Sequence, residues 1–264
     1  RSCAEHGVSI TARGGGTSQA GQAVGGGVQL DFSKYLNRVI ELDPDKRTVR
    51  VQAGIVLDEL NEFLKPYDLQ LPLDLSTSNR ATIGGMVGNN SAGTRSVVYG
   101  KTIDYVHSLT AVLSDGSVVE LQAITTEQLA ESSAQSDREG SCYRIVEQLA
   151  AKHAAEIRRR YPNILRRVGG YNLDAFVDAA NATQAPQPGP QRRSQLAPDS
   201  NASFNLARLI VGAEGTLALV LEVCLHLVPR PKTRTLCTIQ FHDLLEALGA
   251  TPAILEHGPA AVEL

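Results

Sequence analysis

The sequence has no tryptophan and a single methionine, and only 5% of its residues are aromatic. Its longest apolar runs, such as Ala218 to Leu221, are far shorter than the ~20 residues that a membrane-spanning helix needs, so we expect no transmembrane segment. Basic residues number 25 and acidic residues 28, and this near balance leaves no face suited to a phosphate backbone. We therefore expect no nucleic-acid partner.

Cysteine is also scarce. Cys3, Cys142, Cys224 and Cys237 lie far apart, and no two of them have C-x-x-C spacing. Zinc sites, iron–sulfur clusters and thioredoxin-type pairs need closely spaced cysteines, so we expect no metal site in this chain. Reduced, structural thiols indicate a cytoplasmic location, either free or peripheral to the inner face of a membrane. Residues 1–7 lack the apolar run of a secretory signal, so a targeting signal is expected to be absent or removed.

Apolar periodicity predicts a mixture of helices and strands. The predicted elements are a strand at 8–12, hairpins at 38–53 and 109–121, helices at 57–64 and 143–160, a long strand at 219–227, a strand at 236–241 and a helix at 244–255. The buried faces are expected to include Phe63 in the first helix and a stripe of Ile145, Leu149 and Ile157, with His153 at its edge, in the second. Residues 181–203, with four prolines and four glutamines, are predicted to form a mobile loop.

Glycine is plentiful, and it gathers in three elements: RGGGTS at 13–18, TIGGMVGNNSAG at 82–93 and GAEGT at 212–216. Consecutive glycines after a strand let backbone N–H groups turn toward one point and form a nest for an anion such as a diphosphate. Arg13 either adds positive charge there or braces the loop. No element ends in the Lys-Ser or Lys-Thr of a triphosphate loop, and the first lacks the last glycine of the dinucleotide fingerprint, which disfavours a nucleoside triphosphatase and a Rossmann dehydrogenase.

Several motifs occur together in one order: ARGGGTS at 12–18, VQAG at 51–54, LP at 71–72, TIGG at 82–85, NNSAG at 89–93, YG at 99–100, DYV at 104–106 and GAEGTL at 212–217. In this order they resemble the FAD-binding domain of the vanillyl-alcohol oxidase and para-cresol methylhydroxylase superfamily. Within it, the chain is most similar to the D-lactate, glycolate and D-2-hydroxyglutarate dehydrogenase branch.

The resemblance, which runs from Arg1 to about Pro229, implies an α+β fold of two subdomains that clasp an extended FAD. We place the first subdomain at 1–50, the second at 51–230, and the beginning of a truncated substrate cap domain at 231–264. Gly7 looks like the cap of a helix whose beginning the chain lacks. We therefore expect native sequence upstream, including a first strand.

The resemblance also implies which residues bind the cofactor. The diphosphate is expected on the first loop, which consists of Arg13, Gly14, Gly15, Gly16, Thr17 and Ser18. The ribityl, flavin and adenine contacts are expected from Pro72, Asp74, Thr82, Gly84, Gly85, Asn89, Asn90, Ser91 and Gly93, and Glu214 and Gly215 are expected to close the pocket. Thr17 stands where some members attach the flavin through a histidine, so FAD is predicted to bind noncovalently. No catalytic base is identified, and His107, His226 and His242 are each expected to be structural.

The activity implied for the intact protein is oxidation of a small 2-hydroxy acid by hydride transfer to the flavin. The electron acceptor is unknown; RVGGYNLD at 167–174 resembles a segment in members fused to an iron–sulfur domain, which would lie outside this chain. Residues 1–264 alone are expected to be inactive, because the substrate-binding cap is incomplete. The alternatives are a transferase of the alkyl-glycerone-phosphate synthase type, an NADPH-dependent enolpyruvyl reductase, and a flavin-binding module without activity of its own.

Overall fold

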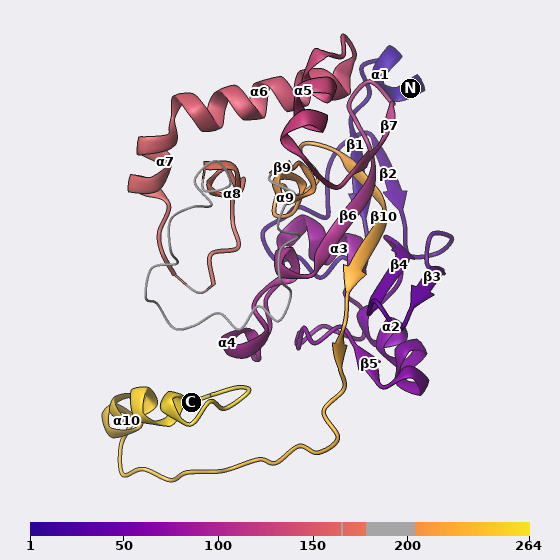
Figure 1. Cartoon of the computed structure of the whole chain (residues 1–264). Helices are drawn as coiled ribbons and strands as arrows, with labels where there is room; N and C mark the ends of the chain where they lie inside the picture. Colours follow the sequence, from indigo (N-terminus) through magenta and orange to yellow (C-terminus); the bar gives the residue numbers. More distant parts are fainter. Residues whose placement is uncertain (165, 178–203) are drawn as a thin grey trace.

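The computed structural model describes residues 1–164, 166–177 and 204–264, and the predicted loop at 181–203 lies outside these ranges (Figure 1). A five-stranded antiparallel sheet with the order β3-β4-β10-β6-β7 forms the centre of the described structure. Its strands are β3 (Val39–Asp43), β4 (Thr48–Gln52), β6 (Val106–Val112), β7 (Val118–Leu121) and β10 (Leu219–His226). The late strand β10 lies between β4 and β6, so the sheet brings together segments that are far apart in the sequence.

Both predicted hairpins of this sheet are confirmed, and their turns have a local cause. Between β6 and β7, Gly116 adopts a φ of +79°, and the Asp115 carboxylate accepts a hydrogen bond from the backbone N–H of Ser117 at 3.0 Å. Between β3 and β4, the Asp43 carboxylate accepts from the backbone N–H of Lys46 at 3.0 Å. Short polar side chains of this kind favour tight turns, which is why the sequence predicts them.

One hydrophobic core joins the sheet to two helices, α2 (Leu57–Leu64) and α3 (Ile83–Asn89). Leu57, Leu60 and Leu64 of α2 are fully buried, and burial of each such side chain contributes roughly 1.5–3 kcal/mol. The predicted end of α2 is confirmed, because a 3₁₀ turn with Pro66 near its start, η1 (Lys65–Tyr67), follows directly. The expected burial of Phe63 is wrong, since this side chain is 42% exposed.

Short pairings and a second group of helices complete the body, and the helices α5 to α8 lie to one side of the sheet (Figure 1). The short strand β5 (Leu69–Gln70) pairs with β11 (Val228–Pro229), and β8 (Ala123–Ile124) pairs with β9 (Phe204–Asn205). The helices are α4 (Ser96–Tyr99), the 3₁₀ helix η2 (Thr102–Asp104), α5 (Thr126–Ala134), α6 (Arg138–Lys152), α7 (Ala154–Arg160), α8 (Asp174–Val177) and α9 (Ala207–Ile210).

The predicted helix at 143–160 is two helices, α6 and α7, separated at His153. Its predicted stripe is wrong for two members, because Ile145 is 54% and Leu149 is 39% exposed. His153 is also exposed rather than at the core edge. Instead α6 buries the side that carries Tyr143, whose ring lies 6.0 Å from the ring of Phe204. The distant strand β9 therefore decides which side of α6 faces inward.

The two ends of the chain have fewer contacts with this core. At the start, α1 (Ser2–Glu5) is followed by Gly7 at a φ of +63°, as predicted, and then by β1 (Ile10–Arg13), which pairs in parallel with β2 (Val28–Asp31). At the other end, the predicted strand at 236–241 is wrong, because these residues form no strand. The last predicted helix is confirmed as α10 (Leu244–Glu256), which lies apart from the sheet (Figure 1).

The division into subdomains stays a prediction; the hairpin of β3 and β4, which spans residue 50, belongs to the five-stranded sheet. None of the described helices is both long and apolar enough to cross a membrane.

Candidate functional site

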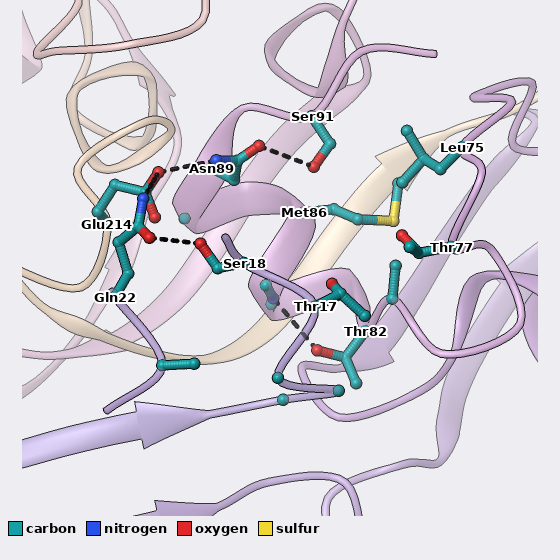
Figure 2. A pocket seen from close by; sticks show the side chains of 18 of the residues that line it. Thr17, Ser18, Gln22, Leu75, Thr77, Thr82, Met86, Asn89, Ser91 and Glu214 are labelled. Atoms are coloured by element: carbon teal, nitrogen blue, oxygen red, sulfur yellow. Dashed lines mark hydrogen bonds between the residues drawn. The ribbon is translucent and has the colours of Figure 1, made fainter. Parts of the chain in front are cut away.

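The three glycine-rich elements, far apart in the sequence, line one cavity of about 580 Å³ (Figure 2). The first element follows β1, the second includes α3, and the third precedes β10. The predicted site residues that line this cavity are Arg13, Gly14, Gly15, Gly16, Thr17, Ser18, Asp74, Thr82, Gly84, Gly85, Asn89, Ser91, Gly93, Glu214 and Gly215. The fold thus brings nearly the whole predicted set together.

Two predicted site residues, Pro72 and Asn90, do not line the cavity. Pro72 is buried between Leu71 and Leu73. Asn90 is fully buried, ends α3 in the left-handed conformation with a φ of +53°, and accepts a hydrogen bond from the backbone N–H of Ile103 at 3.0 Å. Asparagine tolerates this conformation better than most residues, so its place is explained by the end of the helix rather than by a ligand.

The glycines of the first loop are required by its close approach to the second element. A Cβ on Gly14 would lie 2.0 Å from Thr82 Oγ1, and a Cβ on Gly15 would lie 2.1 Å from the carbonyl oxygen of Arg80. Gly16 has a φ of +66°, which other residues rarely adopt. The Arg13 guanidinium donates from Nη1 to the carbonyl oxygen of Ala23 at 2.9 Å. Arg13 therefore braces the loop, which was one of the two roles left open from the sequence.

The N-terminus of α3 is satisfied by the protein itself. The backbone N–H groups of Ile83 and Gly84 donate to the carbonyl oxygens of Ile55 and Ala53, and that of Gly85 donates to Thr82 Oγ1 at 3.3 Å. Gly84 also needs its missing side chain, because a Cβ there would lie 2.7 Å from Ala53 Cβ. The first two amides hold α3 against the segment that follows β4, and the third is capped by Thr82 of the same helix, so the helix start supplies a wall rather than an anion nest.

The third element is pinned to α3 and carries a carboxylate into the cavity wall. Glu214 has a φ of +52°, and its backbone N–H donates to the carbonyl oxygen of Gly88 at 3.0 Å. Its side-chain Oε1 accepts from Asn89 Nδ2 at 2.8 Å and from Gln22 Nε2 at 3.3 Å, as Figure 2 shows. Ser18 donates in turn to Gln22 Oε1 at 2.5 Å. Glu214 thereby links all three glycine-rich elements around one space.

The sequence did not indicate Gln22 or Arg166, which also line the cavity. Gln22 follows the first loop without belonging to its motif, and Arg166 immediately precedes RVGGYNLD without carrying a signal of its own. The apolar part of the lining, from Phe32, Ala53, Leu75, Met86, Ile210 and Val220, was not predicted either. Ala53 lies in the VQAG motif and Met86 in the second glycine-rich element, but nothing in the local sequence marks the other four, because their place in the wall depends on contacts with distant segments.

The histidines considered as bases, His107, His226 and His242, are not among the residues that line the cavity. The rings of His107 and His226 lie edge to face with centroids 4.9 Å apart. In the described ranges, no group of three or more His, Cys, Asp or Glu side chains is placed to hold a metal ion.

The cavity fits a flavin dinucleotide in three respects. Its glycine-rich walls carry no side chains that would block the close approach of a cofactor. The hydroxyls of Thr17, Ser18 and Ser91 supply polar contacts. The apolar lining suits a flat ring system. Binding sites for cofactors characteristically combine such apolar walls with a few placed polar groups.

Comparison with known families agrees with this geometry. Residues 1–122 match the family described as FAD binding domain. The mixed helices and strands and the glycine-lined cavity are those of the para-cresol methylhydroxylase type of FAD-binding fold, and the cofactor is FAD. Residues 1–122 are therefore similar to this FAD-binding family.

Among characterised relatives, D-2-hydroxyglutarate dehydrogenase of Pantoea ananatis (strain AJ13355) is 37% identical over 255 residues, which are 96% of this chain and 23% of that protein. Glycolate oxidase subunit GlcD of Bacillus subtilis (strain 168) is 29% identical over 88% of this chain and 34% of its own length. The solved structure of alkyldihydroxyacetonephosphate synthase superposes with a TM-score of 0.52 at 18% identity, over 88% of this chain and 29% of that one. This last likeness shows the fold alone. The chain spans about a quarter of the length of the D-2-hydroxyglutarate dehydrogenases that it matches (23%).

Proposed function

We propose that this chain is the FAD-binding part of an oxidoreductase that oxidises a small 2-hydroxy acid, with D-2-hydroxyglutarate as the first candidate substrate. The observation that carries the proposal is the convergence of three glycine-rich elements on one cavity, joined through the Glu214 carboxylate. The names of the relatives, D-2-hydroxyglutarate dehydrogenase and glycolate oxidase subunit, support the class of substrate.

Bound FAD would supply the acceptor for a hydride from the α-carbon of the 2-hydroxy acid. The residues of this chain would bind and orient the cofactor: the first loop would hold its polar part, and Phe32, Leu75 and Met86, which line the cavity, would supply an apolar wall that excludes water. Of the described residues that line the cavity, none is a histidine or lysine suited to take the hydroxyl proton. We propose that the base, and further groups that hold the substrate, belong to the remainder of the longer protein.

The path of the electrons after flavin reduction is also a proposal. We propose an acceptor outside this chain, with an iron–sulfur domain as the candidate, on the basis of the segment at 167–174. The four cysteines are unpaired in the structure, which supports a reducing, cytoplasmic compartment.

The test uses two proteins. Residues 1–264, purified and mixed with FAD, should retain one FAD per chain after desalting, and acid precipitation should release all of the flavin, because Thr17 cannot form the covalent bond. A longer protein that contains this sequence, mixed anaerobically with D-2-hydroxyglutarate, D-lactate and glycolate, should lose its oxidised flavin absorbance with one of them.

Residues 1–264 alone should show no such bleaching, because a substrate displaced by even ~1 Å from the flavin can lose ~100-fold in rate. A longer protein whose flavin stays oxidised with every 2-hydroxy acid, or is reduced by NADPH instead, would contradict the proposed function.

A further inference from the structure

The segment at 166–174 reaches the FAD cavity through Arg166. Arg166 lines the cavity, and its guanidinium donates from Nε to Ser96 Oγ at 2.7 Å and from Nη2 to the carbonyl oxygen of Gly93 at 3.1 Å. Gly93 belongs to the second glycine-rich element, so Arg166 joins this segment to the wall at the end of that element.

Neighbouring contacts hold the segment in place on one side. Lys101, which is 5% exposed, donates from Nζ to the carbonyl oxygen of Arg167 at 2.8 Å. The Arg167 side chain forms an ion pair with Asp174 and lies 4.8 Å from the centre of the Tyr161 ring. Arg167 is anchored through both its backbone carbonyl and its side chain, so the backbone of the adjacent Arg166 is held in place.

The other side of the segment is clamped to the third glycine-rich element. Asn172 is buried and donates from Nδ2 to the carbonyl oxygen of Val211 at 2.7 Å. The hydroxyls of Tyr171 and Thr216 are hydrogen-bonded at 3.0 Å. A Cβ on Gly212 would lie 3.2 Å from the carbonyl oxygen of Gly170, so the two backbones are in direct contact. The segment therefore connects the second and third elements behind the cavity.

The ionisable residues of the cavity wall are Arg166, Arg13, Asp74 and Glu214. Arg13 uses its guanidinium to brace the first loop, donating from Nη1 to the carbonyl oxygen of Ala23. Asp74 is paired with Arg95 at 2.8 Å, and the Glu214 carboxylate accepts from two amide groups. The two hydrogen bonds of Arg166 go to neutral acceptors, and it forms no ion pair with any residue in the described ranges. No carboxylate of the described residues therefore pairs with the positive charge of Arg166. Its Nη1 keeps two N–H groups for another acceptor.

We propose that Arg166 is an oxyanion-binding residue of this cavity, whose free N–H groups donate to a phosphate oxygen of FAD or to a carboxylate oxygen of the substrate. The proposal rests on the proposed function, because both oxyanions come from its cofactor and substrate. A guanidinium already oriented by two hydrogen bonds loses little freedom on binding, and charge-assisted hydrogen bonds to oxyanions are among the strongest in proteins.

The first experiment compares FAD with riboflavin, which carries no phosphate. Residues 1–264 are titrated with each, followed by flavin fluorescence at low and high NaCl, as wild type, Arg166→Gln and Arg208→Gln. Arg208 is an exposed residue of α9 outside the cavity wall, so Arg208→Gln is a matched loss of charge. For a phosphate contact, Arg166→Gln should weaken FAD binding by about tenfold to a hundredfold, less at high salt, and should leave riboflavin binding within about twofold.

A second variant separates charge from bracing. Ser96→Ala removes the partner of Arg166 Nε but keeps the guanidinium, so it should change FAD affinity by less than about threefold. Arg166→Lys keeps the charge and should retain part of the affinity. Circular dichroism establishes that each variant is folded.

The second arm tests the carboxylate source. FAD-loaded protein is mixed with oxalate, and the change in flavin absorbance is recorded; if Arg166→Gln keeps its FAD affinity but loses the oxalate response, the contact is to a carboxylate. The proposal is overturned if Arg166→Gln matches wild type with both probes, if it weakens riboflavin as much as FAD, or if Ser96→Ala has the same effect. Wild-type protein that binds no FAD would reject the proposed function itself, and the proposal for Arg166 would fall with it.

Discussion

Two walls of the FAD cavity, the one formed by α3 and the one formed by the first loop, are both glycine-rich, but the protein supports them differently. In the α3 wall, Ile83, Met86 and Val87 are at most 1% exposed and belong to the core under the sheet. The first-loop wall follows the small sheet of β1 and β2, where Ile10 and Val28 remain 37% and 38% exposed. One wall is therefore part of the hydrophobic core, whereas the other depends on a few contacts at the cavity.

Those contacts are the two close approaches of Gly14 and Gly15 and the hydrogen bond from Gln22 to Glu214. Regions with little buried apolar surface open at a lower free energy than the core does. We expect substitutions in the α3 wall to change global unfolding, and substitutions in the first-loop wall to change FAD binding while the fold remains.

The largest expected effect is on stability. Met86→Ala should lower the free energy of unfolding by about 2–5 kcal/mol, because it removes a buried side chain from a packed core. Ile10→Ala, on the half-exposed β1, should lower it by less than about 1 kcal/mol. Urea unfolding followed by circular dichroism measures both. Equal losses would show that the two walls are not supported differently.

Gly15→Asp is the corresponding test of the first-loop wall. Its side chain would have to displace the carbonyl of Arg80, 2.1 Å from the new Cβ, and would bring a negative charge to the cavity, so FAD affinity should fall by about a hundredfold or more. The control is Gly26→Asp, because a Cβ on Gly26 has no atom within 4 Å and this residue does not line the cavity. Retention of FAD after desalting is measured; a folded Gly15→Asp protein with one FAD per chain would contradict the role of this loop.

Gln22→Ala should have a smaller effect, since it removes the two hydrogen bonds through which Gln22 joins Ser18 of the first loop to Glu214 and buries no new group. We expect FAD affinity to fall by about threefold to tenfold, with the unfolding free energy unchanged within about 0.5 kcal/mol. Gln29→Ala, on the small sheet and outside the cavity, is the control. Loss of stability without loss of affinity would place Gln22 in the support of the fold instead.

The smallest expected effect lies in the sheet that supports the α3 wall. Burial raises the pKa of Glu120, but hydrogen bonds from Arg50 and Thr110 outweigh it and hold this pKa below the ordinary value of 4.5. The stabilisation is therefore present above about pH 4.5 and is lost as the pH falls through the lower pKa of the folded state. Glu120→Gln should reduce stability at pH 7 by less than about 1 kcal/mol, because the ion pair is partly exposed, and the difference from wild type should vanish in acid.

Unfolding curves between pH 3 and 7 measure this effect, with Glu131→Gln, at an exposed position of α5, as the control. A difference that grows as the pH falls would contradict the assigned sign.

Local signals account for the parts of the fold that were predicted correctly. The turn at Asp115 and Gly116 and the end of α2 before Pro66 each depend on residues within one turn of the chain. The wrong predictions concern residues whose environment is not local. The stripe at Ile145 and Leu149 has helical spacing, yet the aromatic contact of Tyr143 with Phe204 turns α6 the other way. The segment at 236–241 alternates like a strand but has no partner strand in the described structure.

The same division holds within the cavity. The sequence alone determined where the chain bends sharply and where glycine concentrates, because those properties depend on the backbone freedom of single residues. Only the tertiary structure decided that Gly14 and Gly15 contact Thr82 and Arg80, that Asn90 caps α3 inside the core, and that Gln22 and Arg166 complete the wall. These contacts join residues far apart in the chain, and their energies depend on packing that no short stretch of sequence specifies.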